Sequence, residues 1–240
     1  MSDTDPTLGL VEGLRTTGAI RDFEDRPVDH EVLARVFDTA RFAPNGGNQQ
    51  AWKVVLVEDA ELRQGIRDLY IPGWFEYLEQ RADGVQPWAP IGDRDAEATA
   101  IARATERLAT DDTAAAGDFA ANFDQVPVMA VVLADLRMLA ATDRDLGRYT
   151  LVGGASIYPF VWSILLAGHA EGLGGVLTTM TIRREPEMKA LLGVPDEYAV
   201  VAVLAMGYPV SRPRKLRRGS VSSFATIDRF DGTPLPDPTA

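Results

Sequence analysis

Amide side chains and glycines are concentrated in one short stretch, residues 43–50, which reads Ala-Pro-Asn-Gly-Gly-Asn-Gln-Gln. The glycines allow the backbone to approach a flat ligand closely, and Asn48 and Gln50 each offer hydrogen-bond donors and acceptors. Such a set suits a heterocycle whose edge alternates N–H and C=O groups. An ordinary turn rich in Asn and Gly has the same composition, so the motif alone leaves both interpretations open.

Cationic side chains are concentrated near the C-terminus, in the run Arg212-Pro213-Arg214-Lys215-Leu216-Arg217-Arg218. The run stands out because the chain as a whole has a formal net charge of −11. Arg and Lys are the side chains that hold phosphate groups, as a fork or as a point charge. A nucleic-acid patch is disfavoured because no aromatic residues are interleaved for base stacking. A solvated surface strip remains the plain alternative.

A third stretch, residues 172–179, reads Gly-Leu-Gly-Gly-Val-Leu-Thr-Thr. It is typical of a helix end followed by an extended segment, and its backbone could offer N–H groups to a ligand. It follows a helical pattern rather than a strand, so it does not match the G-x-G-x-x-G dinucleotide fingerprint in context. We therefore do not expect Rossmann-type binding.

Side chains that could perform catalysis unaided are scarce. The chain has no Cys and only two His, His30 and His169, which excludes thiolate zinc sites, iron–sulfur clusters and cysteine nucleophiles. No Ser occupies a G-x-S-x-G elbow. We expect no metal site. If the protein is an enzyme, a cofactor must supply its chemistry.

Composition sets the broad class of the protein. With 46% hydrophobic residues among 240, the chain is expected to be globular. The balance of 24 Lys plus Arg against 35 Asp plus Glu argues against non-specific nucleic-acid binding. The apolar stretches 126–134 and 199–206 are too short to span a bilayer, and the first ten residues are acidic and polar. We expect a cytoplasmic protein without a membrane segment.

Apolar periodicity predicts helices alternating irregularly with three buried strands. The segments expected to be helical are Leu8–Thr17, His30–Phe42, Ala60–Tyr70, Asp95–Ala109, Tyr149–Ala170 and Glu185–Leu192. The strands are Trp52–Glu58, Val126–Ala134 and Ala199–Met206. Pro72-Gly73 is expected to end the third helix, with irregular structure over residues 74–95. This pattern predicts a layered α+β domain.

Four motifs occur in the order seen in one known family. They are the segment Leu14–Phe23 followed by Pro27-Val28, the loop Ala43–Trp52, the helix from Ala155 into Gly172-Leu173-Gly174, and Met206–Pro209 followed by the basic run. The chain in this respect resembles the FMN-dependent nitroreductase family, with its R-x-I-R-x-F, A-P-S-x-x-N-x-Q-P-W and G-L-G motifs. The resemblance covers nearly the whole chain apart from residues 71–120.

The resemblance implies an α+β fold: a three-layer α/β/α sandwich with a mostly antiparallel sheet and helices on both faces. It further implies a single domain over residues 1–240, with a lid or insertion at about 71–120, and an intertwined homodimer that holds two FMN molecules at its interface. The implied reaction is ping-pong: reduced nicotinamide, NADH or NADPH, passes hydride to flavin, and an acceptor then takes it. The acceptors implied are nitroaromatics, quinones and similar flat molecules.

The resemblance also implies which residues hold the cofactor. Arg21 would contact the ribityl phosphate or the pyrimidine edge, with Ala19 in the same stretch. Asn45, Asn48 and Gln50 would lie beside the isoalloxazine ring, from either subunit. Backbone groups of Leu177, Thr178 and Thr179 would face flavin N5. Lys215 and Arg217 match the family's K-x-R phosphate clamp.

The sequence departs from the family pattern in several places. Gly18 stands where Arg is usual, Asn45 replaces Ser, Ala51 replaces Pro, and Trp162-Ser163 replaces a Gln-Asn pair. We expect Arg15 to compensate for the missing Arg, and Gly18→Arg to tighten FMN binding. The departure at Gly18 keeps open a flavin-binding or storage protein with little turnover.

Aromatic residues between Pro72 and Pro90 are the candidates for an acceptor site. We expect Trp74, Phe75 and Trp88 to form a lid over the exposed flavin face, and the alternative is that they pack on the core. The electron donor is likewise open: a reduced deazaflavin is the alternative to NAD(P)H, because the chain lacks a nucleotide fingerprint.

Overall fold

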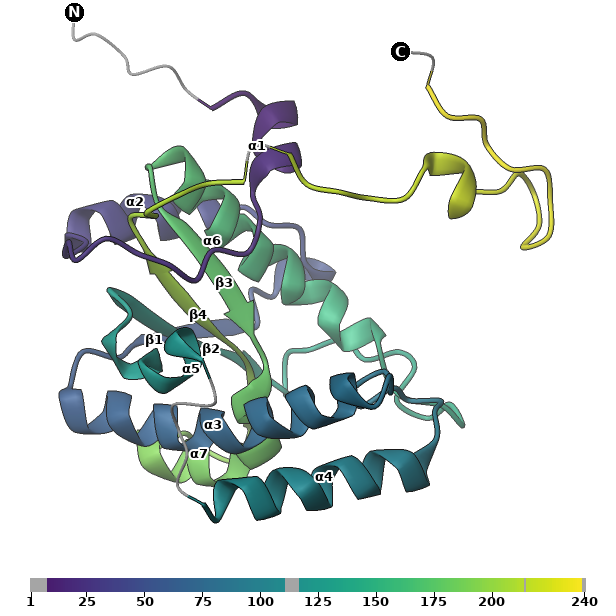
Figure 1. The fold of residues 1–240 in the computed structure, drawn as a ribbon. Coiled ribbons are helices and arrows are strands. Elements are labelled where there is room, and N and C mark those ends of the chain that lie inside the picture. Colours follow the sequence, from purple (N-terminus) through teal and green to yellow (C-terminus); the bar gives the residue numbers. More distant parts are fainter. Residues whose placement is uncertain (1–7, 111–116, 214, 239–240) are drawn as a thin grey trace, which may run out of the picture.

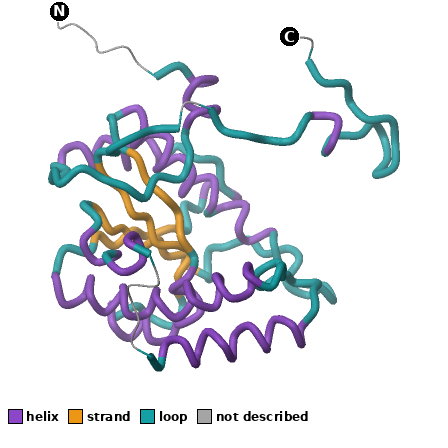
Figure 2. Tube along the Cα trace, viewed as in Figure 1, coloured by secondary structure: helices purple, strands orange, loops and turns teal. Residues whose placement is uncertain are grey.

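A four-stranded sheet lies between two layers of helices (Figures 1 and 2). The computed structural model describes residues 8–110, 117–213 and 215–238. The strands, in the spatial order β1-β2-β4-β3, are β1 (Trp52–Leu56), β2 (Val128–Asp135), β3 (Gly174–Thr178) and β4 (Tyr198–Gly207). The helices are α1 (Leu10–Thr16), α2 (His30–Ala40), α3 (Ala60–Ala82), α4 (Arg94–Leu108), α5 (Asp118–Ala121), α6 (Tyr158–Ala170) and α7 (Glu185–Leu192).

Each pair of neighbouring strands is antiparallel, and β2, which is buried along its whole length, lies at the centre. Side chains alternate between the two faces of a strand, so β2 contributes to two cores. Val131 packs in the core under α3 and α7, whereas Val132 packs in the core under α2 and α6. The expected three-layer α+β sandwich is confirmed.

The glycine-rich segment after α6 forms a fourth strand, β3, which the sequence analysis had only as an extended segment. Two glycines allow it to lie close to its neighbours. A Cβ on Gly175 would lie 2.8 Å from the Ala205 carbonyl oxygen, and one on Gly174 would lie 2.5 Å from Cδ1 of Ile20. Strand β3 therefore packs between β4 and the segment that contains Ile20 without room for larger residues.

Helix α3 does not end at Pro72-Gly73, as the sequence predicted, but continues to Ala82. Proline removes one hydrogen bond within a helix, but here both turns around it bury apolar side chains, including Ile71 and Phe75. Packing of an apolar face is the main source of helix stability in proteins, and it outweighs the lost bond. Gly73 is needed where it stands, because a Cβ there would lie 2.6 Å from the Met180 carbonyl oxygen.

The expected irregular stretch 74–95 is thus helical up to residue 82, and α4 lies alongside α3 (Figure 1). Together α3 and α4 make up most of the expected insertion 71–120, of which residues 111–116 lie outside the described residues. The chain passes from α4 through α5 and a 3-10 turn, η3 (Phe123–Gln125), into β2.

The helix expected over Tyr149–Ala170 begins later, at Tyr158. Residues Val152–Ser156 form a 3-10 turn, η4, because its two glycines disfavour an α-helix and Pro159 fits the first turn of α6. The segment Val152–Ala170 is long and apolar enough to cross a membrane by length and composition, with a mean hydropathy of 1.2, contrary to expectation. The core helix of a water-soluble protein passes the same test, and one face of α6 is buried against the sheet and α2.

Beyond β4, the chain leaves the layered body as an extended arm (Figure 1). The arm contains one 3-10 turn, η6 (Val221–Ser223), and a short bridge between Thr226 and Pro234. Its aromatic residues Phe224 and Phe230 are 75% and 101% exposed. The arm therefore presents large apolar side chains that the layered body does not cover.

Candidate functional site

A cavity of about 1290 Å³ opens beside the edge strand β3. Its walls come from parts of the chain that are distant in sequence: α1 and the segment after it, α6, β3 and the basic run. The residues that line it are Glu12, Leu14, Arg15, Thr16, Thr17, Gly18, Ala19, Arg21, Tyr158, Trp162, Leu165, Gly175, Val176, Leu177, Lys215, Leu216 and Arg218.

The segment after α1 is held in the cavity wall by pairing with β3. Ala19 forms a parallel bridge with Gly175, and the backbone N–H of Ile20 donates to the Gly175 carbonyl oxygen at 2.9 Å. Successive residues of an extended chain point to opposite sides, so Ile20 packs on the body while Ala19 and Arg21 line the cavity. The edge of the sheet thus fixes where Arg21 stands.

The lining is cationic although the chain is acidic. Arg15, Arg21, Lys215 and Arg218 line the cavity together with a single carboxylate among the lining residues, that of Glu12. Guanidinium and ammonium groups converging on one hollow are suited to hold a phosphoryl group by charge-assisted hydrogen bonds. The apolar lining beyond them, which includes Trp162, suits a flat aromatic group.

The basic run packs directly on Gly18. A Cβ on Gly18 would lie 2.8 Å from Cδ2 of Leu216 and 3.1 Å from Cγ of Pro213. The space in which the family's Arg side chain would begin is therefore occupied by Leu216 in this chain. Arg15 lines the same cavity, and its compensation for the missing Arg stays a prediction.

Of the residues predicted to hold the cofactor, Ala19, Arg21, Leu177 and Lys215 line this cavity. The adjacent Thr178 is buried, and Thr179 is exposed; neither lines it. Arg218, part of the basic run expected to hold a phosphate, lines the cavity, whereas Arg217, which matches the family's K-x-R clamp, does not. The backbone carbonyl of Arg217 instead accepts a hydrogen bond from Nη1 of Arg218 at 2.7 Å.

A buried tyrosine supports the end of β3. Tyr70 is 1% exposed, and burial raises the pKa of its hydroxyl to about 12. Thr178 and the positive charge of Arg21 act in the opposite direction on that pKa, since a hydrogen bond and a cation favour the charged form. The phenol therefore stays neutral at neutral pH, hydrogen-bonded to Thr178 at the end of β3 and outside the cavity lining.

The amide loop, residues 43–50, lies apart from the cavity and is braced by its own residues. The Asn45 side chain donates to the Ala43 carbonyl at 3.1 Å and accepts from the Gln50 backbone N–H at 2.8 Å. The Gly46 N–H donates to Oγ of Ser156 at 3.0 Å. Asn45 is therefore occupied in shaping the loop.

The other two predicted amides of this loop face solvent. Asn48 and Gln50 are exposed, and both have left-handed backbones, with φ of 53° and 50°. Non-glycine residues rarely adopt this conformation, which is common at binding sites. Within one chain, the structure does not bring these amides to the cationic cavity.

The aromatic residues predicted as a lid mostly pack on the body. Phe75 is 1% exposed, with the Arg107 guanidinium 5.0 Å from its ring centre, so it cannot contact a substrate as expected and belongs to the core. Trp74 stacks between Tyr70 and Tyr77, with ring centres 6.0 and 5.3 Å away. Phe75 therefore packs on the core, which was the alternative to a lid. It does so because α3 continues through Pro72 and places Phe75 on its buried face.

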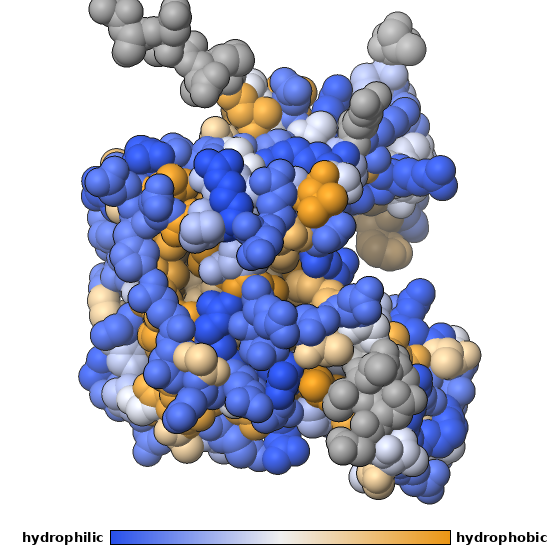
Figure 3. Space-filling model, turned by 60° about the vertical axis from the view of Figure 1, so that its left-hand side comes forward, coloured by the Kyte–Doolittle hydropathy of each residue, from blue (hydrophilic) through white to orange (hydrophobic). Residues whose placement is uncertain are grey.

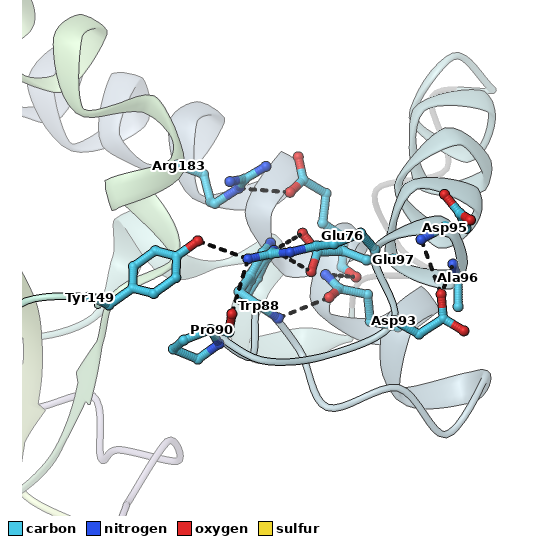
Figure 4. A network of polar contacts seen from close by, with 11 residues as sticks. Glu76, Trp88, Pro90, Asp93, Asp95, Ala96, Glu97, Tyr149 and Arg183 are labelled. Atoms are coloured by element: carbon cyan, nitrogen blue, oxygen red, sulfur yellow. Dashed lines mark hydrogen bonds and ion pairs between the residues drawn. The ribbon is translucent and has the colours of Figure 1, made fainter. Parts of the chain in front are cut away.

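Trp88 lies in the connection between α3 and α4 (Figure 4). Its backbone is left-handed, with φ of 50°. The backbone N–H of Trp88 donates to Oε1 of the fully buried Gln80 at 3.0 Å. The Arg183 guanidinium lies 5.5 Å from its ring centre and also binds Glu76 at 2.9 Å. These contacts fasten Trp88 to the body, and it does not line the cationic cavity.

A second contact ties the start of α4 to the loop before η4. Nη2 of Arg94 donates to the Tyr149 hydroxyl at 2.9 Å, while Nη1 binds Glu97 at 3.0 Å (Figure 4). Asp93 caps α4 by accepting from the N–H groups of Asp95 and Ala96. The connected end of the α3–α4 pair is therefore attached to the rest of the molecule through Arg183 and Tyr149.

Large apolar side chains are exposed around the cavity. Leu10, Val11 and Leu14 on α1 are 70%, 60% and 48% exposed, and Tyr158 and Trp162 on α6 are 46% and 39% exposed. Figure 3 shows hydrophobic surface gathered in a recess between hydrophilic borders on one face of the molecule. Apolar side chains that gather on an exposed face are typical of an interaction site.

Sequence reasoning missed several lining residues, among them Thr17 and Tyr158. Tyr158 and Trp162 are four residues apart, hence on one face of α6, and this spacing could have identified them. Thr17 carried no signal, because only the pairing of residues 19–20 with β3 brings it to the cavity.

Comparisons with known proteins agree with this architecture. The model of the Nitroreductase family matches residues 14–208. A 5,6-dimethylbenzimidazole synthase of Rhodospirillum rubrum is 28% identical over 194 residues, which cover 79% of this chain and 77% of that protein.

Solved structures give the same result. A mutant of an FMN- and NADPH-dependent nitroreductase from Sphigopyxis sp. strain HMH has a TM-score of 0.63 and 25% identity, covering 93% of this chain and 100% of that one. An iodotyrosine deiodinase bound to FMN and 3-iodo-L-tyrosine has a TM-score of 0.61 and 20% identity, covering 93% and 99%. The chain belongs to the Nitroreductase family of FMN oxidoreductases.

Proposed function

We propose that the protein binds FMN with its phosphate in the cationic cavity and passes hydride from NADH or NADPH to a small flat acceptor. The observation that carries the proposal is the convergence of Arg15, Arg21, Lys215 and Arg218 on one cavity in a chain of net charge −11. FMN is the bound cofactor of the deiodinase structure and is named as the cofactor of the nitroreductase.

The cavity fits this cofactor in charge and in shape. Its cations would hold the phosphoryl oxygens, and Ala19 and Leu177, which line its wall, would leave a flat ring system close to the backbone of β3. Bound FMN supplies two-electron redox chemistry that the side chains of this protein cannot supply. Arg21 would also favour negative charge that develops on the ring. The chain's own residues would bind and orient the cofactor. The buried Tyr70 is hydrogen-bonded to Thr178 at the end of β3.

We further propose that two copies of the chain complete each site. Leu14 on α1 and Tyr158 and Trp162 on α6 are exposed and line the cavity, whereas the amide groups of Asn48 and Gln50 lie outside it. A second copy packed on α6 would cover Trp162 and bring its own amide loop to the ring edge. The extended arm, with Phe224 and Phe230 exposed, would clasp the partner. The homodimer thus accounts for three features that are unexplained in one chain.

The acceptor is proposed as a class: nitroaromatics, quinones or other flat aromatic molecules. The relatives named above include a 5,6-dimethylbenzimidazole synthase and an iodotyrosine deiodinase. Because these names point to different reactions, membership of the family does not identify the acceptor. Flat molecules fit because an acceptor must stack on the exposed face of the ring. Reduced deazaflavin as the donor, and flavin storage with little turnover, are the alternatives that the experiment below distinguishes.

Absorption spectroscopy, size-exclusion chromatography with light scattering, and anaerobic reduction test the proposal together. We expect a yellow dimer with one FMN per chain that is bleached by NADPH or NADH and reoxidised by a nitroaromatic or a quinone. Bleaching only by a reduced deazaflavin would identify the alternative donor. Bound flavin that neither donor reduces would identify a storage protein. Colourless monomers that do not bind added FMN would overturn the proposal.

A further inference from the structure

Four aromatic side chains that are able to give up an electron form a continuous row of rings. Tyr70, Trp74 and Tyr77 share one face of α3, because they are spaced by four and then three residues, and Trp88 continues the row. Successive ring centres are 6.0, 5.3 and 6.5 Å apart, with planes inclined by 18°, 20° and 32°. We call these four residues the aromatic row. Each ring packs against the next without an intervening aliphatic side chain.

The inner end of the aromatic row meets the strand that borders the cationic cavity. The Tyr70 hydroxyl is hydrogen-bonded to Thr178, and the preceding residue, Leu177, lines the cavity. Tyr70 also feels the positive charge of Arg21, another lining residue. A second stack leads from Tyr70 to Phe123, but phenylalanine is far harder to oxidise than tyrosine or tryptophan. Only the aromatic row therefore offers an electron a path away from the cavity through these stacked rings.

The outer end of the aromatic row lies at the connection between α3 and α4. Trp88 is partly exposed, and its backbone bond to the buried Gln80 fixes its place beside Tyr77. The Arg183 guanidinium, 5.5 Å from the Trp88 ring centre, opposes positive charge on that ring. The Glu76 carboxylate binds Arg183 at 2.9 Å and offsets this opposition (Figure 4). The row thus ends on a ring that molecules in the solvent are able to reach.

The two tryptophans are better stations for an electron vacancy than the tyrosines. An oxidised tyrosine has to lose its phenol proton, and the hydroxyl of Tyr70 is bonded to a threonine hydroxyl, which is not a base. An oxidised tryptophan can keep its indole proton. Nε1 of Trp88 is buried and has no hydrogen-bond partner in the described part of the chain, so no base draws that proton away. An electron can therefore pass from Trp88 to Trp74 across the Tyr77 ring without a proton moving.

We propose that the aromatic row carries single oxidising equivalents from the cavity to the protein surface. An excited flavin in the cavity takes one electron from Trp74 by way of the Tyr70 ring, so the flavin is reduced and Trp74 is oxidised. Trp88 then gives one electron to Trp74 and is left as the oxidised ring. A thiol in the solvent restores Trp88 by giving one electron and releasing its proton to water. The inference rests on the proposed function, because the flavin is the oxidant.

Close packing alone is the competing explanation of the aromatic row, since stacked rings also stabilise a fold. A packing role predicts that a substitution in the row changes stability and nothing else. The proposed role predicts in addition where an oxidised residue is found after the flavin has been excited. The position of the oxidised residue therefore separates the two explanations.

Anaerobic illumination of the FMN-loaded protein with a nitroso spin trap tests the proposal. The trap adds covalently to a tryptophan radical, whose indole proton then leaves to water, and peptide mass spectrometry locates the adduct. Exclusion of oxygen prevents damage by singlet oxygen. All four tryptophans of the chain are followed: Trp52, Trp74, Trp88 and Trp162. Trp162 lines the cavity and is 39% exposed, so an adduct there reports oxidation that stays local.

Trp74→Phe is the decisive variant, because it keeps a ring in the row and removes the oxidisable indole. We expect the adduct at Trp88 to be clear in the wild type and to fall to the level of the dark control in Trp74→Phe, with no fall at Trp162. Trp52→Phe is the matched control, since Trp52 stacks on Phe160 at 4.4 Å in the other core. It should leave the Trp88 adduct unchanged.

Transient absorption gives a second measurement that does not depend on the trap. In Trp88→Phe the vacancy stays on Trp74, closer to the flavin, so the tryptophan radical should decay faster than in the wild type. Circular dichroism and FMN titration establish that each variant is folded and binds the cofactor. These controls keep a loss of folding from being taken for a loss of electron transfer.

The outcomes separate this inference from the proposed function. Bound FMN together with a Trp88 adduct that is equal in the wild type and in Trp74→Phe would overturn the inference and leave the proposed function intact. Adducts confined to Trp162 in the wild type would have the same meaning. A protein that does not bind FMN would overturn both.

Discussion

The cationic cavity and the amide loop are built in opposite ways. The cavity gathers Arg15, Arg21 and Lys215 from segments up to 200 residues apart in one chain, and the pairing of residues 19–20 with β3 holds its wall. The amide loop is shaped by contacts among its own residues, with one bond to Ser156, and turns Asn48 and Gln50 to solvent. The cations of the cavity thus come from one chain, whereas in the proposed dimer the amide groups would come from the second chain.

Trp162→Glu should break the proposed link between the two regions and have the largest effect. A charge in the exposed apolar face of α6 has to be desolvated on dimerisation, so we expect monomers and FMN binding weakened about 100-fold or more. Light scattering and fluorescence titration measure the two effects. Ile91→Glu is the control, because Ile91 is 96% exposed outside that face. A Trp162→Glu dimer with unchanged FMN affinity would show that the interface lies elsewhere.

Arg218→Ala and Arg217→Ala compare a cation inside the cavity with its neighbour outside. A charge-assisted hydrogen bond contributes about 1.5–3 kcal/mol, so loss of Arg218 should weaken FMN binding about 10- to 100-fold. Arg217→Ala should have less than about a threefold effect on FMN binding, because Arg217 does not line the cavity. If the order of the two effects is reversed, the K-x-R match in the sequence is the better guide to the phosphate contacts.

Asn48→Gly tests the amide loop without straining the backbone, because glycine adopts a left-handed conformation freely. We expect FMN binding about 2- to 10-fold weaker in the dimer, as for a neutral hydrogen bond. In the Trp162→Glu background it should cause no further loss, because the two changes remove the same contact. Gln49→Gly, at the exposed neighbouring residue, is the control. An additional loss in the monomer would mean that the loop reaches FMN within its own chain.

Asp143→Asn should have the smallest effect of these substitutions. It should lower the free energy of unfolding by weakening the segment that supports the amide loop. Asp143 is 2% exposed and accepts from the Leu151 N–H and from Arg148, both at 2.7 Å, which holds the chain leading into η4 and Ser156. The Leu151 N–H is the main cause that lowers the pKa of Asp143 below its ordinary 3.8.

Since the folded-state pKa is lowered, the carboxylate stabilises the fold above pH 3.8 and loses this effect as the pH falls through the folded value. Urea unfolding should therefore show wild type more stable than Asp143→Asn at pH 6, with the difference vanishing in acid. Asp145→Asn, at a side chain that is 87% exposed, should match the wild type throughout. A difference that persists at low pH would rule out the carboxylate as its source.

Local patterns were sufficient for the layers of the fold and for part of the site. The apolar runs predicted β1, β2 and β4 because buried strands are recognisable without knowledge of their partners, and α7 was predicted with its bounds. The motifs around Arg21 and Lys215 identified residues that line one cavity, because each motif is short and its chemistry lies in its own side chains.

What the sequence could not reveal depends on contacts between distant segments. Pro72 was taken as a helix end because the core that sustains α3 on both sides of it is assembled from other elements. Phe75 was assigned to a lid for the same reason. Arg218 and Arg217 are indistinguishable as sequence, and only the path of the tail over Gly18 separates them.

The absence of space for a methyl group between Gly73 and the Met180 carbonyl has a mechanical consequence. Helix α3 cannot slide along the turn that follows β3 without pulling that strand with it. Helix α3 is therefore held closely to the turn that follows β3 at this point. Selection among acceptors in this protein would then evolve by exchanging side chains on a fixed frame rather than by loosening a hinge.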